Sequence, residues 1–125
     1  MSFPSTRLWG WLTLVYMGAI FAVSSLPGRE LPDLGGKDHY AHFLEFSVLG
    51  ALAVMWAVGR FSRRFPLWLV LLGVVVFVSF YGATDEIHQL FVPGRFCDVW
   101  DWVADTLGGM VSVALILPIL KRREA

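Results

Sequence analysis

Two ionisable side chains, His42 and Glu45, interrupt a run of apolar residues that extends from 40 to 58. They are three residues apart, and Asp38 lies four residues before His42, so all three share one face of a helix. A charge near the centre of a bilayer costs at least ~2.5–3.5 kcal/mol, so these groups must face protein or water. A neutral Glu45 bonded to a neighbouring helix would explain one such residue, but two at helical spacing favour a functional role.

A second polar group follows the apolar stretch 67–83. It contains Asp85, Glu86, His88 and Gln89, of which all but Glu86 share a face if the helix continues through them. A lone histidine at a helix end is usually structural. A group of two acids, a histidine and an amide at the end of an apolar span instead favours a functional interpretation.

A stripe of carboxylates opens the fourth apolar stretch, residues 102–120. Asp98, Asp101 and Asp105 follow one another at spacings of three and four. Helix capping and the helix macrodipole explain Asp98 and Asp101, with Asp98 as the candidate N-cap. Asp105 lies a full turn deeper, where neither effect accounts for it.

We expect these three groups to converge at one depth, with Arg95 on the loop that precedes the fourth stretch. Their mutual repulsion can be relieved by shared protons, by pairing with Arg95 and Lys37, or by a bound divalent cation. Two histidines with several carboxylates suit such a cation, although their spacing matches no specific metal signature. The candidate metal ligands are His42, Glu45, Asp85 and His88.

The candidate site residues form two further sets. The candidates for catalysis are His42, Glu45, Asp85, Glu86, His88 and Asp101. The candidates for substrate binding are Lys37, Gln89, Arg95 and Asp105. The single cysteine, Cys97, excludes an internal disulfide and a thiolate metal cluster. No Ser or Cys stands beside a base in the sequence, which leaves Thr84 and Ser47 as the open candidates for a nucleophile.

The elements that must position these residues follow from composition. The chain has 125 residues, of which 57% are apolar and 16% charged, against averages of roughly 45–50% and 25% for soluble domains. The apolar stretches are residues 8–26, 40–58, 67–83 and 102–120. As helices they would each span roughly 25–29 Å, close to a ~30 Å hydrocarbon core. We therefore predict an all-α, four-helix membrane bundle forming one domain over residues 1–125, with 8–26 an uncleaved span rather than a signal peptide.

The charges predict an orientation for this bundle. Seven Lys and Arg flank the spans on the side of the two termini, against three, Arg29, Lys37 and Arg95, in the first and third connections. The positive-inside rule therefore puts both termini in the cytoplasm. Nine of the ten acidic residues fall on or near the other side, so chemistry is expected at the extracytoplasmic face. The zero net charge argues against a nucleic-acid partner.

Four sequence blocks together are characteristic: SSLP at 24–27, KDHYAHFLEFSVLG at 37–50, TDEIHQLFVPGRFCDVWD at 84–101 and DTLGG at 105–109. With them the chain resembles the VanZ-like family of small bacterial integral membrane proteins. The resemblance implies that the family's motif residues here are Lys37, His42, Glu45, Asp85, Glu86, His88, Gln89, Pro93, Arg95, Asp101 and Gly108. The chain has Asp105 where the family usually has Asn, which puts a role for a neutral amide there in doubt.

The family takes its name from an accessory of glycopeptide (teicoplanin) resistance, so the resemblance implies an envelope location and an outer polar site without assigning a reaction. We expect a protein of the bacterial inner membrane that binds or acts on a lipid-linked envelope component. An enzyme of this kind would perform acid/base or metal-assisted hydrolysis or transfer, with His42 or His88 as base and Arg95 binding phosphate. An anionic headgroup would need a divalent ion to approach the acidic excess.

Two alternatives to an enzyme stay open at this point. One is a non-enzymatic binding or resistance protein whose polar cluster recognises its ligand. The other is a cation- or proton-coupled transporter, which the sequence disfavours because no charged relay continues inward. Below Glu45 and Asp105 the spans offer only Ser47, Ser79, Tyr81 and Ser112.

Overall fold

The computed structural model describes residues 5–124, and in that part of the chain all regular structure is helical. The helices are α1 (Thr6–Ser24), the short 3-10 helix η1 (Gly28–Glu30), α2 (Asp38–Phe61), α3 (Leu67–Gln89) and α4 (Val99–Glu124). The four α-helices are long and apolar enough to cross a membrane. The predicted all-α, four-helix membrane bundle is therefore confirmed.

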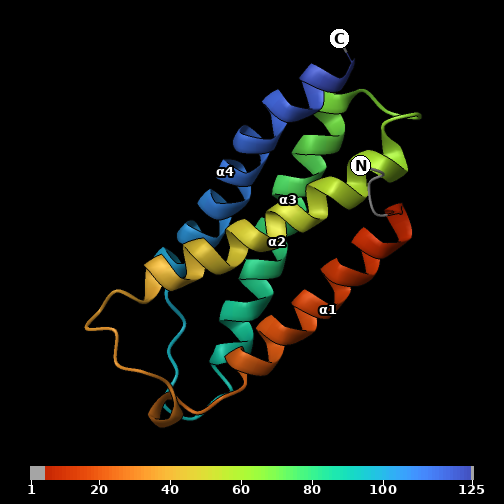
Figure 1. Ribbon diagram of the computed structural model, residues 1–125. Coiled ribbons are helices and arrows are strands. Elements are labelled where there is room, and N and C mark those ends of the chain that lie inside the picture. Colours follow the sequence, from red (N-terminus) through yellow and green to blue (C-terminus); the bar gives the residue numbers. More distant parts are fainter. Residues whose placement is uncertain (1–4, 125) are drawn as a thin grey trace.

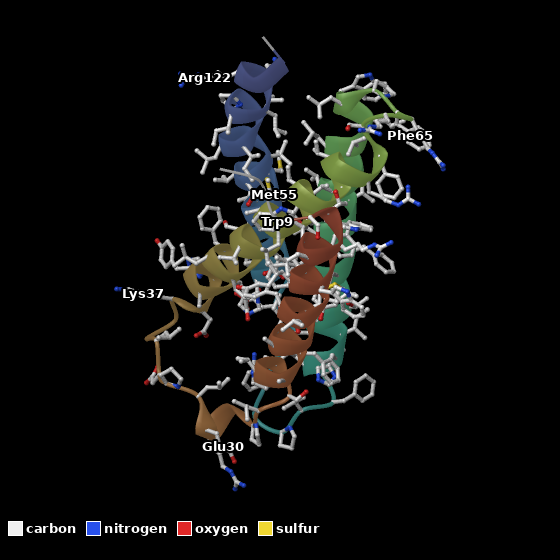
Figure 2. The ribbon with its side chains drawn as sticks, turned by 45° about the vertical axis from the view of Figure 1, so that its right-hand side comes forward. Trp9, Glu30, Lys37, Met55, Phe65 and Arg122 are labelled. Carbon is white, nitrogen blue, oxygen red and sulfur yellow. The ribbon has the colours of Figure 1, made fainter. Side chains whose placement is uncertain are left out.

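The two ends of the bundle carry different charges. The start of α1, the connection from α2 to α3 and the end of α4 all lie toward one end of the bundle, which we call the basic end (Figure 1). The other two connections meet at the opposite, acidic end. Figure 2 shows the separation, with Arg122 and Phe65 toward one end and Glu30 at the other. Because the four helices run up and down in turn, successive connections lie at alternate ends of the bundle.

The helices α2, α3 and α4 extend beyond the apolar stretches at the acidic end. Helix α2 begins at Asp38, α3 continues to Gln89, and α4 begins at Val99. The predicted cap is present, since the Asp98 carboxylate accepts a hydrogen bond from the Trp100 N–H at 2.9 Å. The polar groups of the sequence thus lie on helices, whose backbones fix the positions of their side chains.

Helices α2 and α4 approach closely through small residues. A Cβ atom at Gly108 would lie 2.6 Å from the carbonyl oxygen of Phe43 and 2.8 Å from the amide of Ser47, so the contact requires glycine. The Ser112 hydroxyl donates across the same contact to the Ser47 carbonyl. Such small-residue contacts are the usual way for membrane helices to pack. Here the contact fixes the height and rotation of α2 against α4.

Helix α1 packs on the outside of this arrangement. Two tyrosines tie it to the rest: Tyr16 donates to the Glu45 carbonyl at 2.9 Å, and Tyr81 donates to the Met17 carbonyl at 2.7 Å. Its remaining surface is apolar and exposed, as at Trp11 and Val15. A lipid environment accommodates such a surface, and water does not.

Candidate functional site

One histidine from α2 lies among three carboxylates at the acidic end of the bundle. The Nδ1 atom of His42 is 2.9 Å from Asp105 Oδ1 and 3.7 Å from Glu86 Oε1, and its Nε2 atom is 3.6 Å from Asp101 Oδ2. Only the Asp105 contact is short enough for a hydrogen bond. We call these four residues the His42 cluster. It joins α2, α3 and α4, since each helix contributes at least one member.

The cluster is nearly sealed from solvent. His42 is 8% exposed, Glu86 3% and Asp105 0%. Helix α3 leaves room for the Asp105 side chain at Gly82, where a Cβ atom would lie 2.8 Å from Asp105 Oδ2. The glycine is thus required by the carboxylate that packs on it.

Two oxygens of the cluster have no hydrogen-bond partner within the described part of the chain. They are Glu86 Oε1 and Asp105 Oδ2, both fully buried. The other Glu86 oxygen, Oε2, accepts from the Asp98 amide at 2.9 Å and so anchors the start of α4. With all groups ionised, three carboxylates outweigh one imidazolium by two charges. Shared protons or a bound cation must balance that excess.

Two further predicted residues pair beside the cluster. Gln89 donates to Asp85 Oδ2 at 3.1 Å one turn along α3, and both residues are buried. Glu45 is half-buried on α2. Glu45 and Gln89 line the same cavity, so the carboxylate has polar surroundings inside the apolar span.

That cavity, which we call the polar cavity, measures about 580 Å³. His42, Glu45, Gln89, Arg95 and Asp101 all line it, together with residues of both connections at the acidic end. The two connections are joined where the Gly28 amide donates to the Pro93 carbonyl at 3.0 Å, a contact too close for a side chain at Gly28.

Arg95 stands at the wall of the polar cavity. Its Nη1 atom makes long contacts of 3.4 Å to the carbonyls of Val23 and Leu26 at the end of α1. Neither carbonyl neutralises the guanidinium, and within the described residues Arg95 forms no ion pair. A planar fork of donors suits phosphate and carboxylate oxygens.

Two predicted site residues lie away from the His42 cluster. His88 turns toward α1, where its ring stacks on Phe21 at 4.6 Å and its Nε2 atom lies 3.0 Å from Ser25 Oγ. Lys37 is exposed and points away from the bundle (Figure 2). The expected convergence of His88 with His42 is therefore not seen. Pairing of Lys37 with the carboxylates, one of the three possible remedies for their repulsion, is not found in the described part of the chain.

Sequence reasoning passed over Ser25 as a partner of His88. The only sequence signal was its place in the SSLP block, where it closes the first apolar stretch. Its hydroxyl also donates to the Phe21 carbonyl at 2.7 Å, so it caps α1 as well as contacting α3. Thr84 and Ser47 bond to carbonyls of their own helices, at Tyr81 and Phe43.

A family model described as VanZ/LLP1 matches residues 27–121. The chain belongs to the VanZ/LLP1 family. No curated protein and no solved structure matches it. Family membership and four apolar helices together make this a multi-pass membrane protein.

The residues matched by the VanZ/LLP1 model include the His42 cluster but leave out the first helix. The match includes all of α2, α3 and the connection between α3 and α4, and most of α4, and therefore every member of the His42 cluster. Helix α1 and Ser25 precede it. The contact between Ser25 and His88 thus joins the matched part of this VanZ/LLP1 protein to its first helix.

Proposed function

We propose that this protein binds the phosphate-bearing headgroup of a lipid-linked cell-envelope component in the polar cavity, at the extracytoplasmic face of the cell membrane. The observation that carries the proposal is the cavity itself, which combines Arg95 with a buried acid and histidine cluster at the end of an apolar bundle. A ligand suited to it has a polar, charged head and a tail that stays in lipid.

The orientation rests on charge. The described basic residues Arg60, Arg63, Arg64, Lys121 and Arg122 lie at the basic end of the bundle. Short connections rich in Lys and Arg stay on the cytoplasmic side. The acidic end and its cavity then face outward, where lipid-linked envelope precursors are used, and both termini are cytoplasmic.

The cluster has the groups that acid/base chemistry needs. A histidine oriented by a carboxylate can accept and release a proton during a reaction, and Asp105 at 2.9 Å orients His42 in this way. In a hydrolysis or transfer reaction at a cation-free cluster, His42 would act as the base and Arg95 would bind the phosphate. A binding-only resistance protein would use the same cavity and release no product, so product analysis separates the two.

Transport receives less support from the packing. Inward from the cluster, the described interior is mostly apolar, with Phe46, Leu49 and Val78 fully buried. The buried hydroxyls there, Thr13 and Ser112, donate to carbonyls of their own helices. A proton or cation would need polar groups along that path. The arrangement favours a site open to one side of the membrane.

The test measures lipid binding to the protein in nanodiscs, by native mass spectrometry. A polyprenyl diphosphate should bind, and the matching polyprenol, which lacks the charged head, should bind at least tenfold more weakly. Arg95→Gln should weaken diphosphate binding by about tenfold to a hundredfold, because a charge-assisted hydrogen bond contributes ~1.5–3 kcal/mol. The control is Arg29→Gln, an exposed arginine of η1 at the same end. Equal binding of the two lipids would overturn the proposal.

A further inference from the structure

Three residues of the His42 cluster are placed as metal ligands would be. His42, Glu86 and Asp105 each offer a ligand atom, and these atoms all lie within 4.8 Å of one another. They come from three different helices, so the folding of the bundle brings them together. The imidazole Nδ1 atom is the one that faces both carboxylates, at 2.9 Å and 3.7 Å.

The unpartnered oxygens distinguish this cluster from an ordinary ion-pair network. Glu86 Oε1 and Asp105 Oδ2 are buried, belong to side chains at most 3% exposed, and have no hydrogen-bond partner in the described chain. Leaving a buried acceptor unsatisfied costs ~1–3 kcal/mol, and more for a charged group. A cation held by both oxygens would remove that cost and balance the excess negative charge.

We propose that His42, Glu86 and Asp105 bind a divalent transition-metal cation of the Zn²⁺ or Mn²⁺ type. One imidazole nitrogen with two carboxylate oxygens suits these ions, because both accept mixed nitrogen and oxygen ligands. Ca²⁺ fits less well, since it takes six to eight oxygen ligands. Three protein ligands leave coordination positions for water or a ligand.

The groups around these ligands also suit a metal site. His42 Nε2 faces Asp101 Oδ2 at 3.6 Å, and a metal-bound histidine typically directs its second ring nitrogen to a carboxylate. Glu86 is held by the Asp98 amide through its other oxygen, Oε2. Each of these two ligands is therefore oriented by a neighbour, and their other atoms, His42 Nδ1 and Glu86 Oε1, face each other at 3.7 Å.

The site has a further consequence that rests on the proposed function. His42 and Asp101 line the polar cavity, so a cation on His42 would stand beside the bound headgroup. A diphosphate approaching this acidic wall would be attracted to the cation instead of repelled by the carboxylates. The metal site itself depends only on the three side chains and would stand without any lipid ligand.

The experiment uses the full chain purified with a tag that contains no histidine. After incubation with Zn²⁺ or Mn²⁺ and removal of excess ion, metal analysis should find about one equivalent per chain. Thermal stability should rise with Zn²⁺ concentration by mass action. With Mn²⁺ bound, electron spin echo modulation should detect a directly bound imidazole nitrogen.

Matched variants test the assignment of the ligands. Asp105→Asn and Glu86→Gln keep the shape of each side chain, and each should weaken the metal more than a hundredfold. Asp101→Asn should weaken it about tenfold to a hundredfold, as loss of an outer-shell partner does. His39→Gln, an exposed histidine on α2, should change nothing.

Less than a tenth of an equivalent of metal, or wild-type affinity in both ligand variants, would overturn the proposal. The nitrogen signal uses the wild-type chain, so its absence with Mn²⁺ bound would also overturn it, even if the variants misfold. Lipid binding separates the two proposals. If the protein binds one equivalent of metal but no diphosphate, only the proposed function is overturned. If it binds diphosphate but no metal, only the cation site is overturned.

Discussion

Each half of the bundle contains a cavity, and the two cavities differ in the residues that line them. The polar cavity at the acidic end has charged walls, while the other, nearer the basic end, measures about 420 Å³ and is lined by apolar residues of α2 and α3 such as Trp56, Phe61 and Phe77. In the polar half α2 and α4 touch backbone to backbone at Gly108. Ionisable groups are thus buried next to a close contact between two helices.

This difference shows which half of the bundle determines how the helices are positioned against one another. Apolar side chains in lipid gain little from packing on one another, because the lipid tails are equally apolar. Hydrogen bonds and close backbone contacts are directional, and they are concentrated around His42, Asp105 and Ser112. Substitutions of equal size should therefore cost far more in the polar half than in the apolar half.

The largest loss is expected from His42→Ala. Removing one partner of a buried ionic cluster leaves the other charges uncompensated, which typically costs about 3–5 kcal/mol. Unfolding in mixed micelles with a denaturing detergent measures this loss. The control in the apolar half is Phe65→Ala, a half-exposed aromatic, which should cost less than 1 kcal/mol. Equal losses for the two variants would contradict the comparison.

A smaller loss is expected from Gly108→Ala. The added methyl group would press on the backbone of α2 and separate the two helices, and such overpacking costs about 1–3 kcal/mol. The matched control is Gly73→Ala, in the wall of the apolar cavity, where no atom lies within 4 Å of the added Cβ. That control should be neutral or stabilising by up to ~1 kcal/mol. The same unfolding assay decides whether the signs differ.

The smallest effect is expected at the contact between α1 and α3. Ser25→Ala and His88→Ala each remove the 3.0 Å contact between these side chains, which should cost about 0.5–1.5 kcal/mol. In the double variant the losses should not add, because both substitutions break one contact. Lipid binding should stay unchanged, since neither residue lines the polar cavity. A loss of diphosphate binding in His88→Ala would move the site toward α1.

The sequence was sufficient to predict the helices, because four apolar stretches of membrane-spanning length admit few alternatives. It also placed Asp98 as a cap, since capping depends only on neighbouring residues. The close contact at Gly108 lies on a row of small residues, Ala104, Gly108 and Ser112, a spacing that permits close helix packing but does not say which helix is the partner. These features depend on neighbouring or regularly spaced residues, so they can be predicted from the sequence.

The partners of each polar residue could be predicted only in part. At about 100° per residue, Glu86 and His88 lie on opposite sides of Asp85 around α3. The packing turns Asp85 inward, Glu86 toward α4 and His88 toward α1. Periodicity tells which residues share a face, but the rotation of one helix against another is set by contacts such as the Tyr81 hydroxyl on Met17. Ser25 was missed for the same reason.

The proposed function requires the polar cavity to face the extracytoplasmic side of the membrane. Labelling of Cys97 measures directly which side it faces. Cys97 is the single cysteine of the chain, is exposed, and lies between Phe96 and Asp98, which line the polar cavity. A membrane-impermeant maleimide applied to intact spheroplasts should label Cys97 without permeabilisation. In a Cys97→Ser background, Ser62→Cys in the exposed connection from α2 to α3 should react only after permeabilisation. The reverse pattern would place the cavity in the cytoplasm and contradict an extracytoplasmic site for envelope lipids.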